Sequence, residues 1–263
     1  MEHTRALMVT ALLLIVVATP RVRAQDTSVV PASEIDNLQA ISTFQVAIGH
    51  NKKKLDTLRK DSPEYVAQAA KLAKSYEGLG VAYIRGGRYS EAIPALTSSI
   101  DLSHDVIKKD NINAVYSRAL AYNRSGRAAE AIYDFKNLLK LKDDPLYHEE
   151  LAVAYINMGN KEAALEQYEI LLQARPNDAW FNFQVGYLLA EKGSYAESAR
   201  AYEKAVAGGS QLPQSSVALA YNNLGDAYYH LCEREKTIAA FKKAAELNPD
   251  FAENLGAAYL LRC

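Results

Sequence analysis

The chain has 263 residues, of which 49% are hydrophobic and 23% charged, and its formal net charge is −1 at neutral pH. Ala, Leu, Tyr, Glu and Lys are common, whereas Gly and Pro are few, and this composition favours helices. Proteins that bind nucleic acid use an excess of Lys and Arg to neutralise phosphates. The charge balance therefore excludes that class of partner.

Residues 1–24 differ from the rest of the chain. Arg5 precedes an uncharged apolar stretch from Ala6 to Thr19, and Val22-Arg23-Ala24 follows. This pattern is typical of a secretory signal peptide cleaved after Ala24. The apolar stretch is shorter than the roughly 20 residues that span a bilayer, so we expect no stable membrane insertion after cleavage and a periplasmic or secreted mature protein. An uncleaved anchor is the alternative.

A pattern of small and aromatic residues repeats from about residue 73. Each copy has a Tyr or Leu, here called the anchor, followed by a second set of apolar residues, with a Gly between the two sets in most copies. The anchors are Tyr83, Tyr122, Tyr155, Leu189, Tyr228 and Tyr259, at steps of 39, 33, 34, 39 and 31 residues. Within each set the apolar residues stand three and four apart, which indicates one packed face of a helix.

This pattern resembles the tetratricopeptide repeat, a helix-turn-helix unit of about 34 residues. The resemblance covers residues 73–263 and implies an all-α, right-handed α-solenoid of about five repeats plus a terminal helix. A small residue three positions before each anchor would let the two helices approach closely. These residues are Gly80, Ala119, Ala152, Gly186, Gly225 and Gly256. The two 39-residue steps predict longer loops near residues 103–113 and 208–216.

Residues 25–72 form a predicted N-terminal segment with a capping helix. Ile35, Leu38, Ile41 and Phe44 have the spacing of a helix that covers the first repeat. The sequence from Ser62 to Glu64 predicts the start of the next helix, because Pro is tolerated in a first turn.

Residues with catalytic or metal-binding chemistry are scattered. His50, His104, His148 and His230 fall in different parts of the pattern, and no HExxH or CxxC motif is present. The sequence Gly78-Leu79-Gly80 begins like a phosphate loop, but no Lys-Ser/Thr follows it. We therefore expect no catalytic residues, no metal site, no cofactor and no enzyme activity.

The two cysteines, Cys232 and Cys263, occupy equivalent positions four residues after successive anchors. An oxidising compartment would permit a disulfide. Packed helices lie about 8 to 10 Å apart, whereas a disulfide needs Cα atoms within about 7 Å. Regular stacking thus disfavours the bond, and a shift of the last residue would permit it.

In a solenoid of this kind the first helix of each helix-turn-helix unit lines the concave side. The exposed face of these first helices is therefore the expected binding groove. The predicted contact residues are Tyr116, Asn123, Arg124, Asn157, Trp180, Phe183, Tyr187, Asn222 and Tyr229. The asparagines would bond the main chain of an extended peptide, and Arg124 would hold a carboxylate. Trp180 either faces a ligand or packs between repeats.

Some members of the family hold the C-terminal carboxylate of a partner with Lys, Asn and Arg. Here Glu149, Glu191 and Asp226 stand on the same face, so that function is not implied. We expect an exported scaffold that binds a peptide or a partner protein. The alternative is an accessory subunit of a cell-envelope complex for polysaccharide or protein export or assembly. The last helix, with Leu255, Tyr259 and Leu260, predicts self-association or a further partner.

Overall fold

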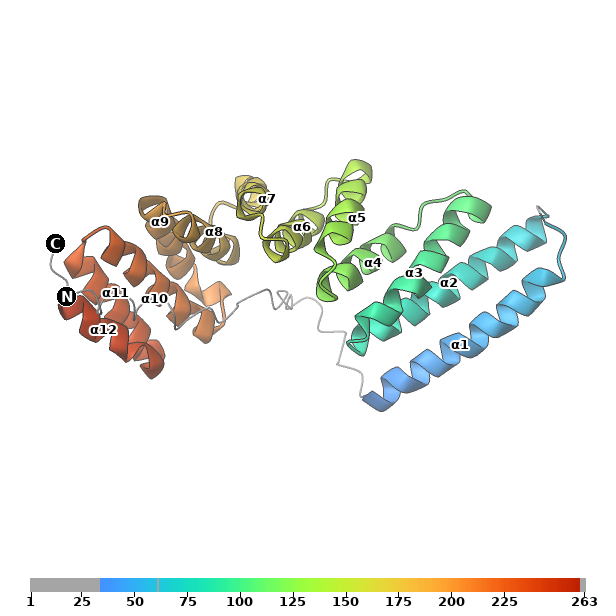
Figure 1. The fold of residues 1–263 in the computed structure, drawn as a ribbon, viewed down its shortest axis with the longest axis horizontal. Helices are drawn as coiled ribbons and strands as arrows, with labels where there is room; N and C mark the ends of the chain where they lie inside the picture. Colours follow the sequence, from blue (N-terminus) through green and yellow to red (C-terminus); the bar gives the residue numbers. More distant parts are fainter. Residues whose placement is uncertain (1–33, 61, 261–263) are drawn as a thin grey trace. The chain divides into compact units, whose positions relative to one another are not determined.

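The computed structural model of the chain describes residues 34–60 and 62–260. All regular structure in these two ranges is helical (Figure 1). The α-helices are α1 (Glu34–Asp56), α2 (Pro63–Arg85), α3 (Tyr89–Leu102), α4 (Ile112–Arg124), α5 (Ala128–Leu141), α6 (Pro145–Asn157), α7 (Lys161–Ala174), α8 (Ala179–Glu191), α9 (Tyr195–Ala207), α10 (Gln214–His230), α11 (Arg234–Leu247) and α12 (Ala252–Tyr259). The predicted signal segment lies outside the described residues.

The helices form two compact units. Unit 1 ends at Asp143 and contains α1 to α5, and unit 2 begins at Asp144 and contains α6 to α12. In both units successive helices pack as pairs, α2 with α3 and α4 with α5 in unit 1, and α6 with α7, α8 with α9 and α10 with α11 in unit 2. The predicted all-α architecture of stacked helix pairs is confirmed.

Both predicted longer loops contain short helical turns. A π-helical segment, Ser103–Ile107, follows α3, and a 3₁₀ segment, Gly209–Gln211, follows α9. Lys108 ends the first of these turns with a left-handed backbone, at φ 56°. The extra residues thus extend the ends of second helices and leave the helix pairs intact.

Close contact between the two helices of a pair depends on the small residue before the anchor. A Cβ atom built on Gly80 would lie 2.4 Å from Leu96, and one built on Gly225 would lie 2.6 Å from the ring of Phe241. Gly186 gives 2.9 Å to the ring of Tyr202. No side chain larger than hydrogen fits without repacking. The prediction of close approach is confirmed at these three positions, whereas Gly256 has no atom within 4 Å.

Helix α1 covers the first pair, as predicted, and the predicted face is confirmed at Ile41 and Phe44 but wrong at Leu38. Ile41, Ile48 and Leu55 are buried at seven-residue spacing, and Phe44 lies on Gly78, where a built Cβ would approach its ring to 2.3 Å. Leu38, predicted to face the core, is 55% exposed. The helix continues to residue 56, and its longer buried stripe points Leu38 outward.

Helix α2 begins as the sequence predicts. Pro63 occupies the first turn, and the Ser62 hydroxyl accepts a hydrogen bond from the amide of Tyr65 at 3.1 Å. The cap satisfies one of the amides that have no partner within the helix.

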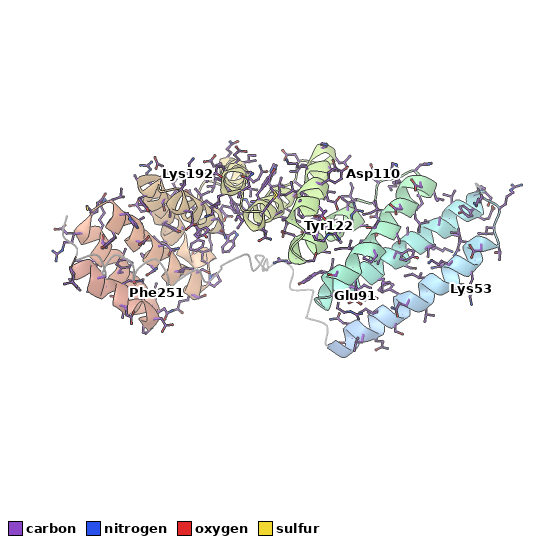
Figure 2. All side chains as sticks on the ribbon, viewed as in Figure 1. Lys53, Glu91, Asp110, Tyr122, Lys192 and Phe251 are labelled. Atoms are coloured by element: carbon purple, nitrogen blue, oxygen red, sulfur yellow. The ribbon has the colours of Figure 1, made fainter. Side chains whose placement is uncertain are left out.

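The turn inside several pairs is held by a cation stacked on the anchor ring, with a carboxylate beside it. Arg88 lies 4.6 Å from the ring centre of Tyr83 and pairs with Glu91. Arg127 lies 4.5 Å from that of Tyr122, labelled in Figure 2, and pairs with Glu130 at 2.8 Å. In unit 2 the carboxylate comes before the cation in the sequence. Lys236 lies 5.0 Å from the ring centre of Tyr228 and pairs with Glu233. Each such contact contributes only modestly, because the charged groups are exposed to solvent.

Cys232 follows α10 in a left-handed conformation, with φ 60°, and is disulfide-bonded. The expected separation of stacked helices had disfavoured such a bond. The second cysteine of the chain, Cys263, lies outside the described residues.

The close contact in the pair α10 and α11 predicts the effect of one methyl group. We expect Gly225→Ala to lower the free energy of unfolding by about 1 to 2 kcal/mol, because overpacking against Phe241 outweighs the better helix propensity of Ala. Gly256→Ala is the matched control, since the same repeat position is open there. Its stability should be unchanged or raised by up to about 1 kcal/mol. Urea denaturation followed by circular dichroism measures both, and equal effects would refute this packing argument.

Candidate functional site

Three predicted contact residues lie on α4 of unit 1. Asn123 is buried, whereas Tyr116 and Arg124 are half-buried. The Tyr116 ring packs edge-on against Phe135 of α5, with 6.1 Å between centres. Asn123 therefore belongs to the interior of unit 1, and Tyr116 and Arg124 are partly accessible.

The other six predicted residues lie in unit 2. Asn157 is exposed at the end of α6, and Tyr187 on α8 and Tyr229 on α10 are half-buried. Trp180, Phe183 and Asn222 are buried, with 8%, 3% and 7% of their surface exposed. The structure thus brings the tyrosines to the surface and places the Trp and Phe inside.

Aromatic rings connect α8 to its second helix. Trp180 stacks on Phe183 with 6.0 Å between ring centres and 13° between planes, and Phe183 meets Tyr202 of α9 edge-on at 5.7 Å. Of the two alternatives for Trp180, its burial and this stacking favour packing within unit 2.

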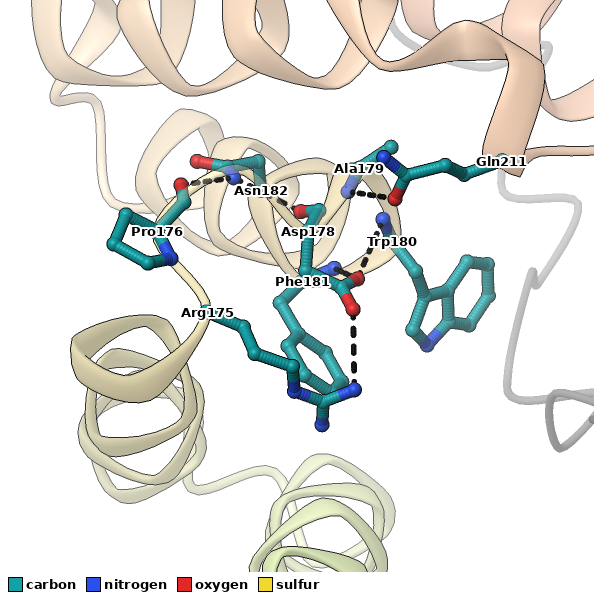
Figure 3. A network of polar contacts seen from close by, with 8 residues as sticks. All are labelled: Arg175, Pro176, Asp178, Ala179, Trp180, Phe181, Asn182 and Gln211. Carbon is teal, nitrogen blue, oxygen red and sulfur yellow. Dashed lines mark hydrogen bonds and ion pairs between the residues drawn. The ribbon is translucent and has the colours of Figure 1, made fainter.

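The first turn of α8, which carries Trp180, is fixed by a polar network (Figure 3). The Asp178 carboxylate accepts hydrogen bonds from the amides of Trp180 and Phe181, at 3.1 and 3.2 Å, and an ion pair from Arg175 at 3.3 Å. Asn182 donates to the carbonyl oxygens of Pro176 and Asp178, both at 2.9 Å. A carboxylate at this position also complements the helix dipole. The network holds the Trp180 backbone in one position.

Asn222 does not present a free amide oxygen to a ligand. Its Oδ1 accepts a hydrogen bond from Nδ2 of Asn254, on α12, at 2.6 Å, and its own amide group donates to Asn223 at 3.4 Å. Asn223 in turn donates to the Tyr202 hydroxyl at 3.1 Å. The predicted peptide-binding asparagine therefore links α10 to α12.

Charged and aromatic side chains gather on a surface that we call the α8/α10 face. It consists of Tyr187 and Glu191 on α8 and Asp226, Tyr229 and His230 on α10. Glu191 pairs with Lys161, and Asp226 lies 3.8 Å from His230, whose ring stacks on Tyr195 at 4.1 Å between centres. The two carboxylates are 41% and 50% exposed.

Carboxylates of the α8/α10 face influence the buried hydroxyl of Tyr202. Burial raises the pKa of this hydroxyl, the hydrogen bond from Asn223 lowers it, and the charges of Asp226 and Glu191 raise it further. Burial also raises the pKa of Tyr187, with Glu191 adding to the shift and Lys161 opposing it. Burial raises the pKa of Asp226, against the opposite effect of His230. The carboxylates of Glu191 and Asp226, on two successive first helices, therefore both raise the pKa of the Tyr202 hydroxyl.

Unit 1 contains a separate open cavity of about 360 Å³ between α4 and α5. Its lining includes Arg118, Tyr122, Tyr133 and Asp134. Arg118 donates two hydrogen bonds of 2.9 Å to the buried Asp134 carboxylate. Burial lowers the pKa of Arg118, but this bidentate bond and the charge of Asp134 outweigh it, so the pKa is raised. The charged groups of the cavity thus satisfy one another.

Residues 34–60 and 62–260 also bear on the class of site. No group of three or more His, Cys, Asp or Glu side chains in them is arranged to hold a metal ion. None of the helices described is both long enough and apolar enough to span a bilayer.

Sequence models of the tetratricopeptide repeat match residues 78–145, 149–215 and 218–251. The chain belongs to the tetratricopeptide repeat family. Tetratricopeptide repeat scaffolds bind protein or peptide partners and are non-catalytic, and this chain is such a scaffold. Sequence reasoning alone had included Glu191 and Asp226 on the first-helix face but had not selected them as site residues.

One curated relative is the DnaJ homolog subfamily C member 7 homolog of Schizosaccharomyces pombe. It is 27% identical over 204 residues, which cover 70% of this chain and 40% of that protein. The chain thus spans about two fifths of the length of that relative.

Solved structures share the fold. MamA has 21% identity and a TM-score of 0.58 over 69% of this chain and 94% of its own. YrrB, described as a TPR protein with an unusual peptide-binding site, has 21% identity and a TM-score of 0.57 over 70% and 91%. BtubC from P. vanneervenii has 14% identity and a TM-score of 0.59 over 82% and 92%. These likenesses show the tetratricopeptide repeat fold alone.

The buried position of Trp180 predicts a loss of stability on truncation. We expect Trp180→Ala to lower the free energy of unfolding by about 3 to 5 kcal/mol, as large-to-small changes in a core do. Tyr187→Ala, on the same helix and half-buried, should cost about 1 kcal/mol. Thermal melting of the two variants measures the difference. An unchanged melting temperature for Trp180→Ala would instead show that the ring faces outward.

Proposed function

We propose that this chain is an exported scaffold that holds an extended segment of a partner protein on the first helices of unit 2, at the α8/α10 face. The observation that carries this proposal is the gathering of half-exposed Tyr187 and Tyr229 with hydrogen-bonding side chains on two successive first helices. Tyrosine provides large contact area and a polar tip, and it is enriched where proteins bind one another.

The family and its relatives support the same function. The chain belongs to a family of protein-binding scaffolds, and YrrB, which shares its fold, is described as having a peptide-binding site. The predicted contact Asn157 is exposed in the same unit and remains a candidate for an additional contact, whereas Arg124 is half-buried in unit 1. Export is supported by the signal-like composition of residues 1–24.

Selection from a random 12-residue peptide library displayed on phage tests the binding role. We expect peptides to be enriched on the full-length protein, and the double variant Tyr187→Ala/Tyr229→Ala to bind them at least about thirtyfold more weakly, because two contact tyrosines together contribute about 2 kcal/mol or more. Tyr133→Ala is the control, since this tyrosine is 68% exposed on α5 of unit 1. Enriched peptides that bind the double variant and the wild type equally well would refute the α8/α10 face as the site.

Export is tested separately, on the protein purified from its own cells. We expect its N-terminus to be Gln25, because the apolar stretch is short and Val22-Arg23-Ala24 suits a signal peptidase. N-terminal sequencing gives the answer directly. A chain that retains the first 24 residues and sediments with membranes would contradict export by cleavage.

A further inference from the structure

Acidic and basic residues are unevenly divided between the two units. Residues 34–143 contain 17 Lys and Arg against 13 Asp and Glu, whereas residues 144–263 contain 10 Lys and Arg against 16 Asp and Glu. The nearly neutral whole thus combines a basic half with an acidic half. Such an asymmetry gives each half its own preference for charged partners.

Within unit 2, acidic groups lie on the first helices, where we propose that a partner binds. Glu149, Glu191 and Asp226 come from α6, α8 and α10, one from each successive repeat. The charges of Glu191 and Asp226 both reach the Tyr202 hydroxyl, while those of Glu149 and Glu150 reach the hydroxyl of Tyr168. The two carboxylates known to be well exposed, those of Glu191 and Asp226, therefore lie on two successive first helices.

The cationic side chains beside this face neutralise its carboxylates only weakly. Lys161 and its partner Glu191 are 44% and 41% exposed, and ion pairs at such exposure are weak and exchangeable. His230 lies 3.8 Å from Asp226, beyond direct hydrogen-bonding distance, and its ring is held by stacking on Tyr195. A cation from a partner can therefore approach either carboxylate and replace these contacts.

Tyrosine rings beside the carboxylates add a second attraction for cations. Tyr187 and Glu191 stand four residues apart on α8, and Tyr229 stands three residues after Asp226 on α10, so each ring has a carboxylate on its own side of the helix. The chain uses the same combination internally, where Arg88 stacks on Tyr83 and pairs with Glu91. Arg is suited to such a site, because its planar guanidinium stacks and forms forked hydrogen bonds together.

We infer that the α8/α10 face selects a basic segment, rich in Arg and Lys with apolar residues between them, and disfavours acidic segments and C-terminal carboxylates. This inference rests on the proposed peptide-binding function and names the chemistry of the partner. The basic partner meets complementary charge on two successive repeats, so an extended segment spans them. Complementary charges of this kind determine partner choice and the association rate more than total affinity.

The test uses a peptide enriched from the random library and two altered versions, one with every Arg and Lys replaced by Gln and one with every Arg and Lys replaced by Glu. We expect the enriched peptides to carry a net positive charge. In fluorescence anisotropy on the full-length protein, the Gln version should bind about tenfold more weakly or worse, and the Glu version weakest of all. The difference should shrink between 0.05 and 0.3 M salt, because the groups are exposed.

Matched variants test whether the preference for a basic peptide arises at the α8/α10 face. Glu191→Gln/Asp226→Asn should weaken the basic peptide about threefold or more while leaving the Gln version unchanged, which also shows that the variant is folded. Glu166→Gln/Glu169→Gln removes the same charge from exposed positions of α7 and should change neither affinity.

Equal affinities for the basic and Gln versions, or equal losses in the two variants, would overturn the inference while the binding function stands. Failure to enrich any peptide would instead overturn the proposed function. Sedimentation could also show self-association that Glu191→Gln/Asp226→Asn abolishes. That result would identify the basic half of a second copy as the occupant and would overturn the inference of a basic partner segment.

Discussion

The structure depends on the close approach of the two helices in each pair. Where Gly80, Gly186 and Gly225 stand before the anchor, a leucine or an aromatic ring of the second helix fills the space that a Cβ would occupy. This contact brings backbone and side chain within van der Waals distance, so the pair packs at the density of a protein interior. Neither helix could bury its apolar face alone, and the core of each unit is built by repeating this contact.

The close approach also determines what the first helices can offer to a partner. Because Phe183 meets Tyr202 edge-on, Trp180 and Phe183 of α8 belong to the interior, and the outward positions are left to Tyr187 and Glu191. Rings in the core thus supply stability, while the half-exposed tyrosines and carboxylates are the residues that we propose for recognition. The separation lets the binding surface change by substitution without loss of the fold.

The repeat could be predicted from sequence because its signals are local. A small residue three positions before each anchor, with apolar residues at helical spacing on both sides, identified the pairs and their turns. The face of α1 was predicted less well, since residues 35–44 cover less than half of a helix that continues to Asp56 and buries Ile48 and Leu55. The direction of Trp180 depends on its stacking on Phe183 and on the contact of that ring with Tyr202 of α9. The bond between Asn222 and Asn254 joins α10 to α12. A periodic pattern identifies the helices but does not specify these side-chain contacts.

Hydrogen–deuterium exchange of the full-length protein, with and without a bound basic peptide, tests most directly whether unit 2 binds through its first helices. We expect added protection in the amides of α8 and α10, whose side chains form the α8/α10 face, because binding suppresses local opening of the elements that it contacts. The helices of unit 1 should exchange as they do in the free protein. Protection confined to α9 and α11, or to unit 1, would contradict binding at the α8/α10 face.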